Sequence, residues 1–183
     1  MNRARSASIA DVTTDMIRSR PVASAAMAIA VVGAATIAGA WFFQHGLGLR
    51  PCPLCLEQRY AYYFAFPFGL LVAFALAKGA PRCLIIPPLA VLTLVVLVNA
   101  GLGVYHAGVE WGFWLGPTEC SGTVLDLGKG SLLENLDRVK VVRCDQVQWR
   151  FLGLSLAGYN ALISLLMAAI SGWGIAALAG KVR

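Results

Sequence analysis

Charged residues are scarce in this chain: Asp, Glu, Lys and Arg make up only 13% of its 183 residues. A soluble domain needs about a quarter of its residues charged, so the composition excludes an ordinary water-soluble protein and indicates that lipid covers much of the surface. The chain also lacks a basic cluster interleaved with aromatic residues, and it carries no nucleic-acid-binding motif. Its net charge of +6 therefore does not indicate a nucleic-acid partner.

Long apolar stretches stand where charges are missing. A helix needs about 20 apolar residues to cross a bilayer, and suitable stretches occupy residues 21–43, 60–77, 84–105 and 151–180. None alternates apolar and polar residues as a membrane barrel strand would, and a backbone in lipid must hydrogen-bond within its own segment. The sequence therefore predicts an all-α membrane protein, a bundle of four transmembrane helices over residues 21–180 that follows a polar tail at residues 1–20.

The basic residues predict the orientation of this bundle. Eight Lys and Arg residues and two acids belong to the termini and the middle connection, so that side carries the whole net charge of +6. The other side has seven bases and seven acids and is neutral. Because loops rich in Lys and Arg stay in the cytoplasm, we expect both termini to be cytoplasmic. Two outer loops, residues 44–59 and 106–150, then lie on the opposite side.

The second outer loop contains the start of a short helix. Ser131 and Glu134 have the spacing of a capping box, in which each side chain satisfies a backbone N–H of the other. Leu132, Leu136 and Val139 follow at helical spacing. This pattern predicts a short amphipathic helix that lies on the membrane surface.

The topology divides the five cysteines into two groups. Cys52, Cys55, Cys120 and Cys144 fall in or beside the outer loops, whereas Cys83 falls at the cytoplasmic end of the third span. Thiols outside the cytoplasm meet an oxidising environment and form pairs. Cys83 has no partner on its own side, so we expect it to be a small buried apolar residue.

Cys52 and Cys55 form a C-x-x-C motif at the start of the second helix. The positive partial charge of a helix N-terminus stabilises a thiolate, and Arg59 lies one turn further on the same face. A disulfide between Cys52 and Cys55 would close a very short ring and stabilise the fold little. The motif therefore predicts a redox-active pair, with a metal clip as the alternative.

Cys120 and Cys144 are separated by 24 positions. A bridge between them would stabilise the fold by about 3 kcal/mol, so one interpretation is a structural disulfide. The other is a second redox pair that exchanges electrons with the C-x-x-C motif. A zinc site made of all four cysteines usually contains two C-x-x-C motifs; the second pair is not one, so we predict no metal site.

The combination of these motifs resembles a known family, the disulfide bond formation protein B (DsbB) family of bacterial inner membranes. The resemblance covers the chain from the first span to the fourth. It implies a four-helix bundle that oxidises a periplasmic thioredoxin-like protein, DsbA, and delivers the electrons to ubiquinone or menaquinone. Its carriers are Cys52-Pro-Leu-Cys55 with Arg59, Tyr105-His106-Ala-Gly-Val-Glu110, Cys120, and Cys144-Asp-Gln-Val-Gln-Trp149.

Residue roles follow from the resemblance by position. It implies that Cys120 forms the mixed disulfide with the partner and that Cys144 resolves it. Cys52 and Cys55 would then take the electrons, with Cys55 facing the quinone and Arg59 beside it.

His106 matches a quinone-proximal histidine of the family, although its spacing to the loop cysteine differs by about one residue. The alternative is an inert interfacial histidine. Glu110, one turn later, has the position of an ordinary interfacial charge.

Two other interpretations compete with this one. Vitamin K epoxide reductase-like enzymes also couple loop cysteines to a C-x-x-C motif and a quinone, but there the motif follows the loop pair, whereas here it precedes it. A non-enzymatic membrane protein with two structural disulfides, such as a transporter subunit, predicts polar groups deep inside the spans. Asn99 and Asn160 are almost the only ones in this sequence.

Overall fold

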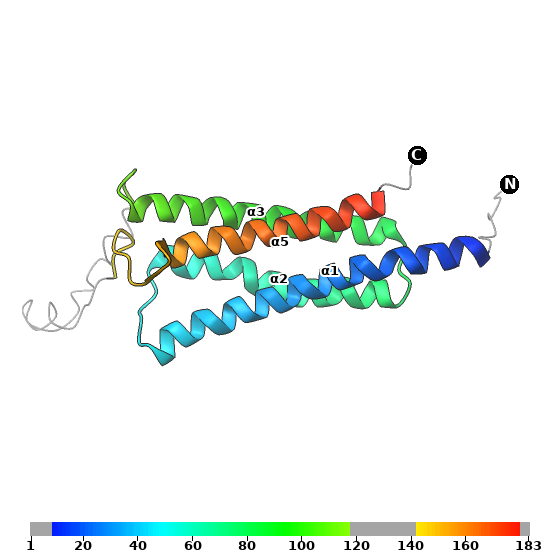
Figure 1. Ribbon diagram of the computed structural model, residues 1–183, viewed down its shortest axis with the longest axis horizontal. Coiled ribbons are helices and arrows are strands. Elements are labelled where there is room, and N and C mark those ends of the chain that lie inside the picture. The colour runs from blue at the N-terminus through cyan, green and yellow to red at the C-terminus, as the bar shows by residue number, and fades with distance from the viewer. Residues whose placement is uncertain (1–8, 118–141, 180–183) are drawn as a thin grey trace, which may run out of the picture.

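The computed structural model describes residues 9–117 and 142–179, with side chains from residue 21 onward. Its long helices are α1 (Ile9–Trp41), α2 (Pro53–Ala77), α3 (Arg82–Glu110) and α5 (Leu156–Ala179). They lie side by side in an elongated bundle, with the start of α1 and the end of α5 at the same end (Figure 1). All four are long and apolar enough to cross a membrane. The structure thus confirms the predicted all-α architecture with four spans.

The first helix extends beyond its predicted limits in both directions. Helix α1 begins at Ile9 and so includes residues 9–20, which the sequence assigns to the polar tail. Its membrane-length apolar part starts at Pro21, and a π-helical turn, η1 (Phe42–Gly46), continues it to Gly46. The outer connection before α2 is correspondingly short.

Helix α2 begins at Pro53 rather than near residue 60 because its first turn is well capped. Cys52 precedes the helix in an extended conformation, and its sulfur accepts the backbone N–H of Cys55 at 3.3 Å. Pro53 suits the first helical position because the N–H it lacks would have no helical partner there. The C-x-x-C motif is therefore attached to the end of a membrane helix.

The end of α3 and the start of α5 also differ from the prediction. Helix α3 continues to Glu110 instead of ending near residue 105, so the segment after Tyr105 is helical. The fourth helix begins at Leu156, because residues 150–155 form a small antiparallel hairpin of β1 (Arg150–Phe151) and β2 (Leu154–Ser155). Leu152 and Gly153 both have positive φ, as the favoured two-residue hairpin turns require.

Close contact between small residues holds the helices together, since lipid provides no hydrophobic drive for helix association. Helix α1 packs mainly on α2, and α3 packs mainly on α5. A Cβ atom on Gly69 would approach the backbone oxygen of Ala26 to 2.9 Å, and one on Gly103 would lie 2.8 Å from Asn160 Nδ2. These two glycines allow the helix pairs to approach.

A polar network crosses the middle of the bundle. The Tyr62 hydroxyl lies 2.6 Å from Asn160 Oδ1 and 3.0 Å from Ser164 Oγ. Asn99 Nδ2 donates to the same two oxygens, at 3.1 and 2.9 Å. The buried amides thus satisfy one another and fasten α2, α3 and α5 together, which is a packing role.

Cys83 differs from the prediction of a buried apolar residue: it is a free and exposed thiol. It lies in the first turn of α3, where residues 81–84 are all exposed because the helix begins at the end of the bundle. The predicted amphipathic helix with Ser131 and Glu134, and Cys120, lie outside the described residues.

Candidate functional site

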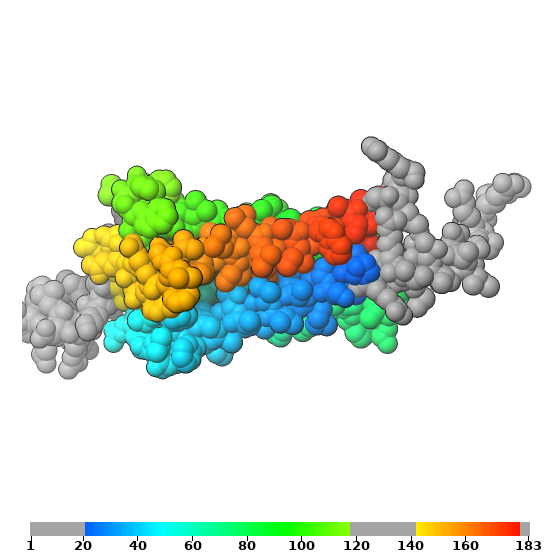
Figure 2. All heavy atoms as spheres, viewed as in Figure 1, coloured from blue at the N-terminus to red at the C-terminus, as the bar shows by residue number. Residues whose placement is uncertain are grey.

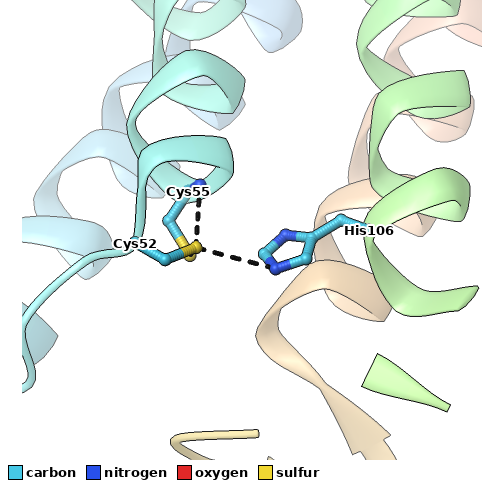
Figure 3. Close-up of side chains that lie close together, drawn as sticks. All are labelled: Cys52, Cys55 and His106. Carbon is cyan, nitrogen blue, oxygen red and sulfur yellow. Dashed lines mark hydrogen bonds between the residues drawn. The ribbon is translucent and has the colours of Figure 1, made fainter. Parts of the chain in front are cut away.

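Cys52 and Cys55 lie at the N-terminal end of α2 as a pair of free thiols. Cys52 is almost completely buried, whereas Cys55 is half-buried. Their Sγ atoms are hydrogen-bonded at 2.8 Å, and the backbone N–H of Cys55 also points to the Cys52 sulfur (Figure 3). Two thiols at this separation need little movement to form a disulfide.

His106 of α3 faces the pair across the bundle (Figure 3). Its ring is buried, and its Nε2 lies 3.7 Å from the Cys52 sulfur. On its other side Nδ1 lies 3.0 Å from the side-chain amide nitrogen of Gln58. Because that amide nitrogen can only donate, Nδ1 accepts and Nε2 keeps its hydrogen. This arrangement lets the ring present an N–H to Cys52.

These contacts favour a thiolate at Cys52. The hydrogen bond with the Cys55 thiol lowers the pKa of Cys52 to about 5; His106 acts in the same direction, while burial opposes it. At neutral pH Cys52 is therefore ionised. A thiolate is the nucleophilic and electron-donating form of cysteine.

A cavity of about 360 Å³ adjoins the pair. Its polar lining includes Cys55, Arg59, His106 and Glu110. Ligand sites of this kind are mostly apolar clefts with a few placed polar groups, of about 300–1,000 Å³. Apolar walls come from α1, η1, α5 and the segment before it: Ile37, Phe43, Trp149, Phe151, Leu156 and Ile163.

The segment at residues 142–155 lies over this end of the bundle, between the end of α3 and η1 (Figure 2). The rings of Trp149 and Phe43 lie 4.9 Å apart, and Gln148 donates to the backbone oxygen of Arg50. The Tyr159 hydroxyl donates to the backbone oxygen of Phe151 at 3.0 Å. These contacts fasten the segment over the cavity from both sides.

Arg59 lies one turn beyond Cys55 and lines the cavity. Its guanidinium donates to the side-chain oxygen of Gln44. Among the described residues no carboxylate forms an ion pair with it. The remaining donors of the guanidinium are therefore free to bind an oxygen of a ligand in the cavity.

Glu110 differs from the ordinary interfacial charge that its sequence position indicates. It is half-buried on α3 and lines the same cavity as His106, which lies one helical turn earlier in the chain. Its Oε2 is buried and has no hydrogen-bond partner among the described residues. The spacing of four residues already predicts a shared helix face with His106, a signal available in the sequence.

Cys144, in the second outer loop, packs against the C-x-x-C pair. It is buried and disulfide-bonded, and it belongs to one apolar cluster with Cys52, Leu54 and Val109. Its backbone also lies within reach of the His106 ring. The structure therefore brings together the C-x-x-C pair, His106 and one cysteine of the loop pair, while Cys120 lies outside the described residues.

The geometry of the cysteines differs from that of a zinc site. Ligand atoms of Cys52, Cys55 and His106 lie within 4.8 Å of one another. Two thiolates bound tetrahedrally at about 2.3 Å would hold their sulfurs about 3.8 Å apart, whereas these lie 2.8 Å apart. Cys144 is disulfide-bonded and is not a thiolate ligand. The arrangement is that of a dithiol ready for oxidation beside a second, oxidised cysteine.

Comparison with known proteins gives a consistent answer. The profile of the family described as "Disulfide bond formation protein DsbB" matches residues 22–174. The chain is 34% identical over 149 residues to Disulfide bond formation protein B of Methylococcus capsulatus, covering 75% of this chain and 84% of that protein. The protein of the same name from Nitrosospira multiformis is 31% identical over 159 residues, covering 83% of this chain and 90% of the relative. That of Marinobacter nauticus is 31% identical over 150 residues, covering 75% and 82%.

These matches confirm the resemblance found in the motifs, and the matched residues reach into all four membrane-length helices. A dithiol at a helix end, beside a disulfide-bonded loop cysteine, is the chemistry that a disulfide oxidoreductase needs. The chain belongs to the DsbB family of membrane disulfide bond formation proteins.

Proposed function

We propose that this protein is a membrane thiol oxidase that reoxidises a periplasmic thioredoxin-like dithiol protein of the DsbA type. Two cysteine pairs pass the electrons to a membrane quinone, ubiquinone or menaquinone. The observation that carries the proposal is the Cys52–Cys55 dithiol, which lies between disulfide-bonded Cys144 and a cavity lined by Arg59. A relay needs this order: an electron source on one side and an acceptor site on the other.

The relay consists of two exchanges and one oxidation. A thiolate of the partner attacks the Cys120–Cys144 disulfide and forms a mixed disulfide with Cys120. The second thiol of the partner then attacks this mixed disulfide, and the partner leaves with its own disulfide formed. The reduced loop pair then reduces a Cys52–Cys55 disulfide by the same chemistry. Finally the Cys52–Cys55 dithiol becomes a disulfide again. Its two electrons, together with two protons, leave for the quinone.

The cavity fits a quinone head group. Apolar walls of aromatic and aliphatic side chains suit the ring and its isoprenoid tail, and Arg59 offers N–H donors for a carbonyl oxygen. When bound, a quinone supplies a two-electron acceptor that becomes a quinol. Arg59 orients it next to Cys55, and the walls exclude water from the reacting sulfurs.

The proposal includes location and orientation. Basic residues cluster at the termini and the middle connection, which favours a cytoplasmic position for both termini in the bacterial inner membrane. The end of the bundle with the C-x-x-C pair then faces the periplasm, where the partner is oxidised. Arg143 and Asp145 beside Cys144 are exposed, so a globular partner can approach this loop, although the Cys144 side chain itself is as buried as that of Cys52.

Trapping of intermediates tests the order of the relay. Cys144→Ser leaves Cys120 without the thiol that re-forms the loop disulfide, so the mixed disulfide that the Cys120 thiolate forms with the oxidised partner should accumulate on a non-reducing gel. Cys55→Ser should block quinone reduction yet still allow exchange in the loop. If Cys144→Ser instead traps the partner on Cys52 or Cys55, the proposed direction is wrong and the loop disulfide is structural.

A further inference from the structure

The carboxyl of Glu110 is the one acidic group among the described residues that lines the cavity beside the dithiol. It stands on α3, one turn beyond His106, on the face that looks across to the start of α2. Its Oε2 is shielded from solvent and has no hydrogen-bond partner in the described part of the chain. A buried oxygen left unpaired in a native structure is uncommon and calls for an explanation.

Several charged or titratable groups face this carboxyl from the elements around it. His106 shares its helix, Cys52 and Cys55 approach from the start of α2, and Arg150 approaches from β1. The Ser155 hydroxyl of β2 also neighbours it. Arg59 of α2 and Arg143 of the segment before β1 line the same cavity.

The proton balance of the site leaves a role for a group of this kind. Oxidation of the dithiol by a quinone forms one S–S bond and delivers two electrons and two protons to quinone oxygens. Because Cys52 is a thiolate, the pair itself holds one proton, on Cys55. The second proton must come from elsewhere, and a residue that lines the cavity can hold it close to the quinone.

His106 competes for that proton, but only at the cost of a hydrogen bond. Its Nδ1 lies 3.0 Å from the amide nitrogen of Gln58, and its Nε2 faces the Cys52 sulfur (Figure 3). To take up a further proton, the ring would have to give up the Gln58 hydrogen bond, because the amide nitrogen cannot accept. A carboxyl with an unpaired oxygen has no such obstacle.

We propose that Glu110 is the proton carrier of the dithiol site: it holds one of the two protons that accompany the electrons of the dithiol and delivers it to an oxygen of the quinone in the cavity. The inference rests on the proposed function. In this step the Cys52–Cys55 bond forms, one proton leaves the Cys55 thiol and the other leaves Glu110. When the loop pair reduces the C-x-x-C disulfide again, one of its two protons returns to Cys55 and the other to Glu110.

Two variants and one control test the proposal. Glu110→Gln keeps the size of the side chain but cannot carry a proton, and Glu110→Asp keeps the acid on a shorter stem. Glu57→Gln removes an exposed acid at the same end of the bundle as a matched control. In single turnovers with pre-reduced protein, Glu110→Gln should slow quinol formation by about 100-fold, within the range of acid–base contributions. Glu110→Asp and small weak acids in the buffer should restore part of the rate.

A second readout does not depend on quinone. Infrared difference spectra between the dithiol form and the chemically oxidised form should show the loss of a protonated carboxyl band in the wild type and in Glu57→Gln, and no such band in Glu110→Gln. Wild-type turnover in Glu110→Gln would overturn the proposal. Slow turnover of Glu110→Gln would also overturn it if no infrared band depends on Glu110 and weak acids restore none of the rate, because that result indicates a structural role.

The two readouts also separate this inference from the proposed function. If the wild type reduces no quinone, the proposed function fails, and the infrared band still decides whether Glu110 holds the proton. If the wild type reduces quinone and Glu110→Gln does so equally fast, only the assignment of Glu110 fails.

Discussion

The ionisation of Cys52 allows the sharpest quantitative prediction. The structure lowers the pKa of this thiol from 9.0 to about 5, mainly through its hydrogen bond with Cys55. At 1.36 kcal/mol per pKa unit, this favours the thiolate by about 5 kcal/mol. Replacing Cys55 with Ala removes the largest contribution and leaves burial, which opposes ionisation, so the pKa of Cys52 should rise by several units. Cys55→Ser keeps a hydroxyl donor and should raise the pKa less.

The assay is a pH titration of thiolate absorbance, supported by the pH dependence of alkylation at Cys52. It is performed in a background in which the other cysteines cannot contribute: Cys83→Ser, Cys120→Ser and Cys144→Ser. With Cys55 present, the midpoint should lie near pH 5. A midpoint near 9 with Cys55 present would show that Cys52 is not a stabilised thiolate, and equal midpoints for Cys55→Ala and Cys55→Ser would show that the hydrogen bond from position 55 does not stabilise it.

The same thiol predicts how stability depends on pH. A group whose pKa is lower in the folded state stabilises the fold fully above its unfolded pKa, and the contribution disappears as the pH falls through its folded pKa. For Cys52 the window extends from about 9 down to about 5. Over this range, the reduced protein should lose stability with falling pH relative to Cys52→Ser. Parallel pH profiles of the two proteins in thermal unfolding would contradict the assignment.

Three further predictions concern Arg59, Gln58 and Cys83. Arg59→Ala should weaken quinone binding by about 10- to 100-fold, the range for hydrogen bonds to charged groups, and Arg59→Lys should be milder because it keeps the charge; equal affinities in a quinone titration would exclude the role. Gln58→Leu frees the histidine tautomer and should raise the Cys52 pKa by about one unit, the size of one hydrogen bond; an unchanged thiolate titration would argue against it. Membrane-impermeant thiol reagents added outside intact spheroplasts should leave Cys83 unmodified, and its labelling from outside would reverse the orientation.

The four spans were predictable because hydropathy alone determines which segments can cross a bilayer. Their ends were not, because they depend on local contacts that hydropathy does not contain. Cys52 and Pro53 cap α2 seven residues before the predicted start at residue 60, and the 150–155 hairpin delays α5. Cys83 shows a related limit: its exposure follows from where α3 begins relative to its neighbours, which hydropathy does not give.

The site shows the same division between local and tertiary information. The C-x-x-C motif and its relation to Arg59 follow from spacing along one helix. The contact of His106 with both Cys52 and Gln58 depends on how α3 packs against α2, and no pattern in the sequence specifies that packing. Whether Glu110 Oε2 has a hydrogen-bond partner likewise depends on the tertiary structure around it.

The central claim is that electrons from a partner dithiol reach a quinone through the Cys52–Cys55 pair. Its most direct test mixes purified protein with an excess of reduced DsbA-like partner and a quinone, and follows quinol and partner disulfide together. We expect one quinol for each partner disulfide, no sustained partner oxidation without quinone, and no quinol from Cys55→Ser. Partner oxidation that continues without quinone, or quinol formation by Cys55→Ser at the wild-type rate, would contradict it.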